Sequence, residues 1–353
     1  MNSSGQFSEI PLVDLEHAFD SAGQRDETAG ELGEICHDIG FAVLVNHGIP
    51  KTVIDSVFDA ARRLFELPLE QKHLIDKRKS PHFRGWEPEG AEYTNARPDI
   101  REQVDLWTEH PVCRDNEGPA YRRLLGPNQW PPEDLLPGYR NAVEAWINHA
   151  GLLADKIMSL LALSLELDRD YFERLFGDQR MSLTKLIRYP KTPAGQFGVN
   201  AHHDAGFLTI LAPGTTPGLQ VENVDGDWLD VPIVEGGLVM NIGEMLQSIS
   251  GNYFVATPHR VLSPDARQSV GYFHGPSLDT PLTPLPLAAR FTQAVAASPR
   301  HARAGFMAQR DETAQGVADM SSPHHPDVYG EQLWNYFARS YPDNVKRHYP
   351  DLI

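Results

Sequence analysis

The residues best suited to chemistry lie in segment 200–210, which contains His202, His203 and Asp204. On an extended strand, residues i and i+2 point to the same side. His202 and Asp204 would then present an imidazole and a carboxylate together, with His203 facing away. A second histidine, His259, follows Asp204 by 55 residues (259 − 204), enough chain to cross a β-barrel and return on a neighbouring strand. These side chains form a candidate metal site.

Two histidines and one carboxylate on one side of an ion leave three adjacent coordination positions open. That facial arrangement is typical of non-haem Fe(II) oxygenase sites, whereas zinc more often has a closed tetrahedral site or three ligands and a water. A lone His-x-Asp is weak evidence, because many histidines only make hydrogen bonds. The motif Arg267-Gln268-Ser269 strengthens the hypothesis. Its guanidinium can clamp a carboxylate and its hydroxyl can add a hydrogen bond, as a metal-bound dicarboxylate cosubstrate would need.

The elements that must position these residues differ between the two halves of the chain. The N-terminal half is predicted to be mostly helical, because apolar residues recur at helical spacing in 27–39, 51–67 and 135–167. The last of these stretches has room for two helices in succession. Two short runs, 10–13 and 41–45, are predicted strands.

After Tyr171, short β-type runs follow one another, separated by Gly, Pro, Asn or Asp, which is typical of a closed or two-sheet antiparallel barrel. The predicted strands are 183–187, 207–211, 219–224, 237–242, 255–261 and 269–273. Residues 77–132 are rich in Pro, Gly and charge, and we expect loops and short strands there. We expect three regions that pack as layers of one unit: a mostly helical region at 1–170, a barrel core carrying the site at 171–277, and a C-terminal extension at 278–353 with a helix over 329–345.

Composition narrows the class of protein without indicating its chemistry. Among 353 residues, 48 Asp and Glu against 31 Lys and Arg give a formal charge of −17, which opposes nucleic-acid binding. No stretch approaches the roughly 18 uncharged apolar residues of a membrane span, and no secretory signal is visible. The two cysteines, Cys36 and Cys113, form no disulfide framework. We therefore expect a soluble, acidic, cytoplasmic protein of open oligomeric state.

Five ordered blocks resemble the iron(II)- and 2-oxoglutarate-dependent dioxygenases of the isopenicillin N synthase-like superfamily. The blocks are IGFAVLVNHGIP (39–50), LIRYP (186–190), AHHDAGFLT (201–209), LVMNIGEMLQ (238–247) and TPHRV (257–261). The resemblance extends from about Ile10 to Pro276. Residues 329–341 are also similar to the C-terminal helix of bacterial members.

The resemblance implies a mainly β core with α additions: a double-stranded β-helix, or jelly roll, flanked by N-terminal and C-terminal helices. It implies that His202, Asp204 and His259 bind iron. By the same matching of positions, Arg267 and Ser269 hold the far carboxylate of 2-oxoglutarate. Tyr189 occupies the place of a tyrosine that touches either this cosubstrate or a substrate carboxylate. Two positions depart from the family pattern: His203 replaces a small or hydroxyl residue, and Glu244 replaces an aspartate.

The implied activity is oxidation of a small molecule by O2, with release of succinate and CO2. Hydroxylation is the expected outcome, and desaturation and cyclisation remain open. Three alternatives also stay open: an Fe(II) oxidase of the same fold that does not use 2-oxoglutarate, fragmentation of 2-oxoglutarate to ethylene, and, with least support, a binding module without catalysis. The substrate is expected to be a small metabolite, with a carboxylate hinted at by Arg188 and Tyr189. The candidate substrate contacts are Arg188, Arg84, Glu92, Phe273 and Gln247.

Overall fold

The computed structural model describes residues 7–94, 97–113, 118–193, 195–298, 301 and 326–352. Its helices are α1 (Ala22–Asp38), α2 (Lys51–Phe65), α3 (Leu69–Lys72), α4 (Tyr139–Ser164), α5 (Tyr171–Phe176), α6 (Glu244–Ile249), α7 (Ala289–Ala297), α9 (Tyr329–Ser340) and α10 (Pro342–His348). Single 3-10 turns are η1 (His73–Ile75), η2 (Lys77–Lys79), η3 (Ala120–Leu124) and η5 (Pro350–Leu352). Among these described residues, no helix is long and apolar enough to cross a lipid bilayer.

The strands form two main sheets and one hairpin. They are β1 (Leu12–Asp14), β2 (Phe41–Val45), β3 (Gly85–Glu87), β4 (Tyr93–Thr94), β5 (Arg97–Pro98), β6 (Glu102–Trp107), β7 (Leu183–Tyr189), β8 (Val199–His202), β9 (Leu208–Ala212), β10 (Leu219–Glu222), β11 (Trp228–Asp230), β12 (Leu238–Ile242), β13 (His259–Val261) and β14 (Arg267–His274). The large sheet has the order β1-β2-β12-β9-β14-β7-β6-β3, and the small sheet has the order β11-β10-β13-β8. Only β1 and β2 pair in parallel within these sheets.

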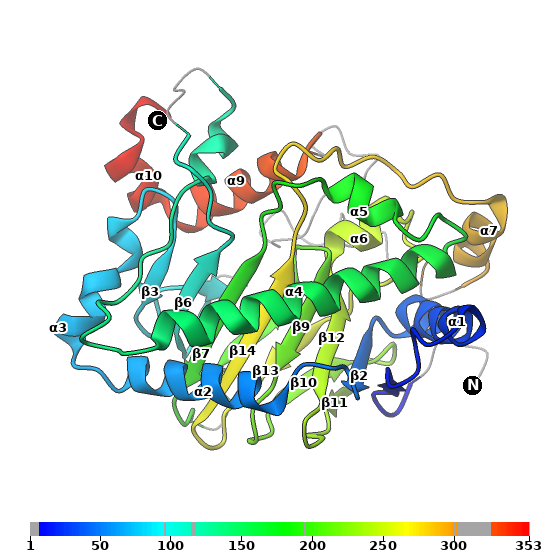
Figure 1. The fold of residues 1–353 in the computed structure, drawn as a ribbon, viewed down its shortest axis with the longest axis horizontal. Helices are drawn as coiled ribbons and strands as arrows, with labels where there is room; N and C mark the ends of the chain where they lie inside the picture. Colours follow the sequence, from blue (N-terminus) through cyan, green and yellow to red (C-terminus); the bar gives the residue numbers. More distant parts are fainter. Residues whose placement is uncertain are drawn as a thin grey trace.

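Alternation along the strands gives the large sheet two buried faces. On β9 and β12, Ile210 and Met240 face a cluster that also contains Trp146 and Ile157 of α4. Figure 1 shows α2 and α4 lying across this face of the large sheet. The other face packs against the small sheet through a second apolar cluster. Its members include Phe41, Val43, Ile187, Tyr189 and Val239 of the large sheet and Val199, Leu219, Val221 and Val261 of the small sheet.

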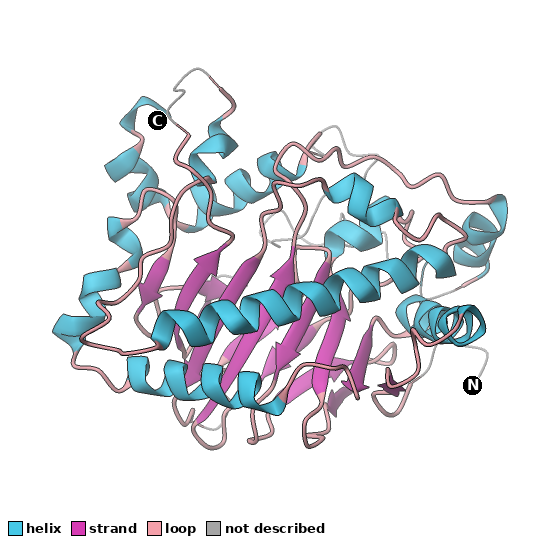
Figure 2. Cartoon of the chain, viewed as in Figure 1, coloured by secondary structure: helices cyan, strands magenta, loops and turns pink. Residues whose placement is uncertain are grey.

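Two facing, mainly antiparallel sheets with helices outside them confirm the predicted mainly β core, and Figure 2 shows how the helices surround the strands. The strand predicted at 41–45 coincides with β2, and the helix predicted at 51–67 is α2, which ends two residues earlier. The stretch 135–167 forms the single helix α4 rather than two helices in succession. No proline interrupts α4, and its Gly151 is tolerated inside the helix.

The turn between α1 and β2 requires a glycine for a steric reason. Gly40 has φ +73°, in the left-handed region that favours glycine. A Cβ atom at this position would lie 2.0 Å from the carbonyl oxygen of Val255. The Gly40 amide donates to the carbonyl of Ile35 at 2.9 Å, which closes the end of α1. This turn carries the chain directly from α1 into the large sheet.

The region expected to contain loops and short strands, 77–132, holds more buried sheet than predicted. β6 has six buried residues, and β3 pairs with it in antiparallel fashion. The acid-rich segment 86–92 begins in β3, where Trp86 and Glu87 are buried. Glu87 is buried because Lys77 forms an ion pair with it.

The C-terminal helix predicted over 329–345 is broken into α9 and α10. The break falls at Tyr341, directly before Pro342, which begins α10 as its first residue. Proline cannot donate the backbone hydrogen bond that a continuous helix would need there. Phe337 of α9 packs against Phe83 and Trp107, with ring centroids 4.8 and 5.7 Å away. This contact holds α9 beside the strands β3 and β6 (Figure 1).

Candidate metal centre and pocket

Register within the small sheet brings two of the three proposed metal ligands together, and the turn after β8 brings the third. His202 ends β8 and His259 begins β13, and the two residues are antiparallel partners. Asp204 lies two residues beyond β8, so the expected continuous strand ends before it and the chain turns there. Its Oδ1 atom lies 3.7 Å from His202 Nε2 and 3.5 Å from His259 Nε2. One ligand atom from each of the three residues lies within 4.8 Å of the others.

Backbone carbonyls orient both imidazoles. His202 Nδ1 lies 2.9 Å from the carbonyl oxygen of Asn200, and His259 Nδ1 lies 3.2 Å from that of Thr257. A carbonyl only accepts, so Nδ1 must carry the proton in each ring, which leaves the lone pair of Nε2 facing Asp204. Burial, followed by the neighbouring His259, lowers the pKa of His202 to about 3. The imidazole is therefore neutral at physiological pH, which is the form that binds a metal.

Two side chains hold the carboxylate of Asp204. Thr209 Oγ1 donates to Asp204 Oδ2 at 2.5 Å, and Asn241 Nδ2 donates to the same oxygen at 2.7 Å. Burial raises the pKa of Asp204, but His259, His202 and Asn241 outweigh this effect and hold the pKa well below its usual range. The carboxylate is therefore ionised, with Oδ2 occupied and Oδ1 facing the histidines. Two imidazole nitrogens and one carboxylate oxygen are a donor set that fits Fe(II).

Thr209 and Asn241 are functional neighbours that the sequence prediction missed. They lie opposite each other on β9 and β12. The same row continues across the sheet through Phe273, Leu183 and Trp107, each the register partner of the one before. Because the row joins five strands that are distant in sequence, no spacing within the chain reveals it.

The two residues that depart from the family pattern lie next to each other. His203 Nδ1 is 3.7 Å from Glu244 Oε1, and both side chains are buried. Glu244 is the first residue of α6, and its amide donates to the carbonyl of Asp204 at 2.8 Å. Strand alternation predicts that His203 faces away from the metal, yet both it and Glu244 line the pocket described below.

The residues proposed to hold 2-oxoglutarate lie on paired strands. Arg267 of β14 faces Tyr189 of β7, and its guanidinium carbon lies 5.0 Å from the Tyr189 ring centroid. The guanidinium donates to the carbonyls of Pro213 (3.0 Å) and Thr216 (3.3 Å). Ser269 follows on the same face of β14 and is also buried.

Burial lowers the pKa of Arg267, since no described carboxylate lies within ion-pair distance of its guanidinium. A buried cation without a counter-ion is costly. Arg267 is therefore suited to receive a carboxylate from a bound molecule. Arg267, Ser269 and Tyr189 are not among the residues that line the pocket beside the metal centre.

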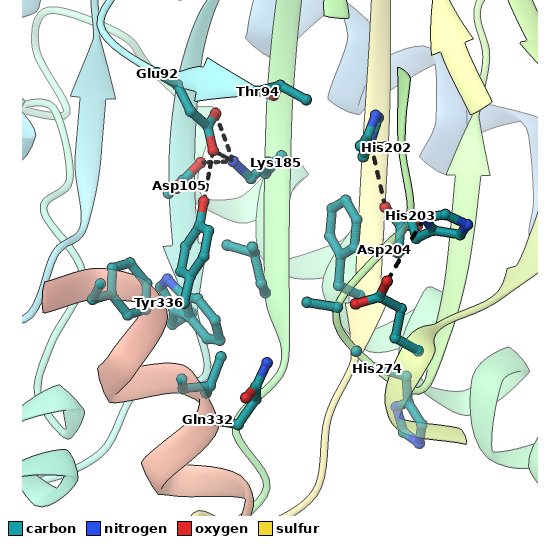
Figure 3. Close-up of a pocket in the computed structure, with 18 of the residues that line it drawn as sticks. Glu92, Thr94, Asp105, Lys185, His202, His203, Asp204, His274, Gln332 and Tyr336 are labelled. Atoms are coloured by element: carbon teal, nitrogen blue, oxygen red, sulfur yellow. Dashed lines mark hydrogen bonds and ion pairs between the residues drawn. The ribbon is translucent and has the colours of Figure 1, made fainter. Parts of the chain in front are cut away.

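One pocket extends from the proposed metal ligands to a charged cluster (Figure 3). Its lining residues are Glu92, Thr94, Arg101, Asp105, Trp107, Leu183, Lys185, His202, His203, Asp204, Ala205, Gly206, Glu244, Phe273, His274, Tyr329, Gln332, Leu333, Tyr336 and Phe337. Charged side chains gather at one end, the proposed ligands lie at the other, and aromatic and aliphatic residues lie between them. The side chains from Tyr329 to Phe337 all come from α9.

Glu92 is the centre of the charged end. Its carboxylate oxygens both lie 3.2 Å from Lys185 Nζ, and Oε2 lies 2.6 Å from Arg101 Nη2. Gln103 donates to Oε2 at 2.6 Å, and the hydroxyl of Tyr336 donates to Oε1 at 2.8 Å. Burial raises the pKa of Glu92, but Lys185 and Arg101 outweigh this effect, so the pKa lies well below its usual range. The Tyr336 bond ties α9 to this cluster.

Of the predicted substrate contacts, Glu92 and Phe273 line the pocket. Arg84 lies elsewhere: it is fully buried, and it donates to the carbonyls of Leu124 (3.0 Å) and Thr108 (3.2 Å). Arg84 therefore ties η3 to the segment after β6, and it is not available to a substrate in the pocket.

Arg188 and Gln247 also lie outside the lining of this pocket. Arg188 forms an ion pair with Glu102 and donates to the carbonyl of Phe65 at 3.1 Å. Its place in β7 points it to the opposite face from Lys185, because neighbouring residues of a strand alternate. Gln247 Oε1 accepts a hydrogen bond from the amide of Ala256 at 2.6 Å. This bond fixes the loop between α6 and β13.

The fold and the site together define the class of protein, which is a jelly-roll protein with two histidines and a carboxylate at one end of the barrel. Residues 10–133 match the family described as non-haem dioxygenase in morphine synthesis N-terminal, and residues 178–276 match the 2OG-Fe(II) oxygenase superfamily. The chain belongs to the Fe(II)- and 2-oxoglutarate-dependent oxygenases of the isopenicillin N synthase-like superfamily. It is therefore an oxidoreductase that uses iron, 2-oxoglutarate and O2.

Its relatives have diverse substrates. The chain is 34% identical over 287 residues to the 2-oxoglutarate-dependent dioxygenase frbJ of Dothideomycetidae sp. (strain 11243), covering 77% of this chain and 76% of that protein. It is 33% identical to homoarginine-6-hydroxylase 2-ODD-C23 of Glycine max, covering 79% of this chain and 89% of that protein. The crystal structure of a full-length Neurospora crassa protein in complex with alpha-KG and thymine is similar, with a TM-score of 0.70, 26% identity, and coverage of 81% of this chain and 91% of that chain.

Proposed function

We propose that this oxygenase binds Fe(II) through His202, Asp204 and His259 and holds the far carboxylate of 2-oxoglutarate with Arg267 and Ser269. The observation that carries the proposal is the three-donor cluster, whose ligand atoms lie within 4.8 Å of one another. The buried guanidinium of Arg267 supports the second part, because it has no carboxylate partner in the described part of the chain. Tyr189, next to it, is proposed to contact the cosubstrate.

We propose hydroxylation of a small molecule as the reaction. When iron, 2-oxoglutarate and O2 are bound, they supply an oxidant able to take hydrogen from a C–H bond, with release of succinate and CO2. The protein orients the substrate and excludes water. Phe273, Leu183 and Trp107 form the apolar wall between the charged end and the metal ligands. Such a wall lets the substrate present a C–H bond to the metal without a competing water molecule.

Titration of the Fe(II) protein with 2-oxoglutarate in the absence of O2 tests this proposal. A metal-to-ligand charge-transfer band is expected, and Arg267→Leu should weaken the apparent 2-oxoglutarate affinity by about 10- to 100-fold, the range for losing a charge-assisted bidentate contact. Ser269→Ala should weaken it only a few-fold. If no band forms, the alternative of an oxidase that does not use 2-oxoglutarate is favoured.

Turnover with candidate substrates provides a second test. His202→Ala should abolish both Fe(II) binding and succinate formation, and full turnover in this variant would refute the ligand assignment. Gas analysis in the same assay detects ethylene, which would identify fragmentation of 2-oxoglutarate as the main reaction.

For the substrate, we propose a small metabolite that bears a carboxylate. Arg188, one of the two residues that suggested a carboxylate, lies outside the pocket lining. Arg101 and Lys185 lie on the pocket wall and are paired with Glu92, so a substrate carboxylate would share these two cations with Glu92. The relatives named above include a hydroxylase of homoarginine and a protein crystallised with thymine, and both molecules are small and polar.

A further inference from the structure

The fixed charges at the distal end of the pocket do not balance. Four buried or nearly buried carboxylates (Glu87, Glu92, Asp99 and Asp105) interlock with three cations (Lys77, Arg101 and Lys185). The cluster therefore carries one negative charge in excess. On the opposite face of β6, Glu102 is paired with Lys72 and with the half-exposed Arg188, where water screens the charge.

The metal end adds negative charge. Asp204 and Glu244 line the pocket there. A bound Fe(II) ion would offset these two carboxylates, and 2-oxoglutarate would then bring two negative charges against the single charge of Arg267. Whether the His203 imidazole, 3.7 Å from Glu244, is counted as neutral or as protonated, the loaded metal end has no net positive charge, so the excess negative charge of the distal end makes the field of the pocket negative. In a site shielded from water, such a field attracts a cation and opposes an anion more strongly than it would at the surface.

Hydrogen bonding at the charged end is also incomplete. Asp105 Oδ1 and Gln103 Oε1 are buried acceptors without a hydrogen-bond partner among the described residues. The ion pair of Asp105 Oδ1 with Lys185 spans 3.5 Å, longer than a hydrogen bond. Asp105 and Gln103 lie two positions apart on β6, so both side chains are on the same face of the sheet as Lys185. A bound ligand would satisfy these two acceptors by donating N–H hydrogen bonds to them.

Two donors at the same place lack partners as well. The Nε atom of Arg101 and the Nε1 atom of Trp107 are buried and make no hydrogen bond within the described part of the chain. Both residues line the pocket. A ligand that forms hydrogen bonds with all of these groups needs both N–H donors and an acceptor. Because the charged end has an excess of negative charge, we expect the donor group of the ligand to be the charged one and to be a cation.

We infer that the substrate carries a protonated amine or guanidine in addition to its acceptor group, and that this cation binds beside Glu92 and Asp105. The inference rests on the proposed function, because it names the substrate class of the same pocket. A basic amino acid or a related amine or guanidine has this combination of groups. A dicarboxylate or an uncharged terpene-like molecule does not.

Binding of charged and neutral isosteres tests the inference without requiring turnover. The Fe(II) protein with 2-oxoglutarate is titrated without O2, by calorimetry, with L-arginine against L-citrulline and with L-lysine against L-norleucine. Agmatine, putrescine and L-glutamate complete the panel. At least one cationic probe should bind ten-fold or more tightly than its neutral isostere. If no cationic probe does so, including the case in which none binds, the inference is overturned.

Variants then locate the cation. Glu92→Gln and Asp105→Asn should each weaken the cationic probe by ten-fold or more and leave its neutral isostere unchanged. Glu89→Gln is the matched control, because Glu89 is exposed three residues before Glu92. Equal loss for both isosteres would indicate a folding defect caused by releasing Lys185 and Arg101, and the wild-type comparison would then decide alone. The charge-transfer band is also measured without probes. If the band is absent, the proposed function is wrong. If the band is normal but cationic and neutral probes bind equally well, only this inference is wrong.

Discussion

Thr209 lies outside the proposed ligand set, and we expect it to affect metal binding through Asp204. Its hydroxyl donates to Asp204 Oδ2 at 2.5 Å and helps to turn Oδ1 toward the histidines. Thr209→Val keeps the side-chain shape but removes the donor. We expect Fe(II) affinity to fall by about 10- to 100-fold, the usual cost of losing an outer-shell partner. Anaerobic Fe(II) titration measures this, and Thr209→Ser, which keeps the hydroxyl, should bind iron nearly as well as wild type. Unchanged affinity in Thr209→Val would show that Asn241 alone orients the carboxylate.

The ionisation of a single residue, Asp76, should make the stability of the protein depend on pH. Burial raises the pKa of its carboxyl, but hydrogen bonds from Arg78 and His73 outweigh burial and lower the pKa to about 2. The folded pKa is thus below the ordinary value of 3.8, so the contribution to stability is present above about pH 4 and is lost as pH falls toward 2. Asp76→Asn should be less stable than wild type at pH 7, and the difference should shrink by pH 2.5. Urea unfolding at both pH values measures it.

A matched control for this experiment is Asp134→Asn, because Asp134 is exposed and no salt bridge is described for it. This variant should match the wild type at each pH. If Asp76→Asn instead lost the same stability at pH 7 and pH 2.5, the ionised form of Asp76 would not be the stabilising species.

Among the elements, those with a complete local pattern were predictable. β2 is an unbroken apolar run between Gly40 and Asn46, and α2 repeats apolar residues at helical spacing up to Pro68. In both cases the signal lies within the element itself. The grouping of His202 with Asp204 also had a local signal, because the two residues are two positions apart, although β8 ends before Asp204. Their binding of a metal stays a prediction.

β6 shows why other elements were not predictable. Its sequence, EQVDLW, includes two acids, yet all six residues are buried. The acid Asp105 is buried because Lys77 and Lys185 pair with it, 28 and 80 positions away (105 − 77 and 185 − 105). No pattern inside β6 shows that these cations are near. The same reason hid Tyr336, whose hydroxyl reaches Glu92 across 244 positions of sequence.

The hydrogen bond between α9 and Glu92 can be tested at the level of the element. Tyr336→Phe removes a donor to a buried carboxylate and should lower the free energy of unfolding by about 1–3 kcal/mol, the usual value for a hydrogen bond to a charged group. Urea unfolding measures the change. Tyr171→Phe is the control, since Tyr171 is only partly buried and no hydrogen bond of its hydroxyl is described. It should change stability by less than about 0.5 kcal/mol. If the two variants lost equal stability, the bond to Glu92 would not anchor α9.

The whole molecule places its site at one end of the space between two sheets. The face of the large sheet that lies under α2 and α4 (Figure 1) is filled with apolar side chains, and the other face carries Thr209, Phe273 and Lys185. The large sheet therefore packs against the helices through one apolar face and presents the functional residues on its other face. α9 closes the pocket from the far end of the chain, so the first and last thirds of the sequence both contribute to the site.

The net charge of −17 makes a further prediction for the molecule as a whole. Like charges spread over the surface repel one another and destabilise the compact state. Raising NaCl from about 0.01 to 0.15 M shortens the screening length from roughly 30 to 8 Å. We expect the melting temperature to rise by about 1–3 °C over this range, as a change of about 1 kcal/mol produces in a protein of this size. Most described surface ion pairs are exposed and worth little, so their weakening should not cancel the gain. Calorimetry measures the shift, with equal-osmolarity sucrose as the uncharged control, and a fall in melting temperature would show that these ion pairs outweigh the repulsion.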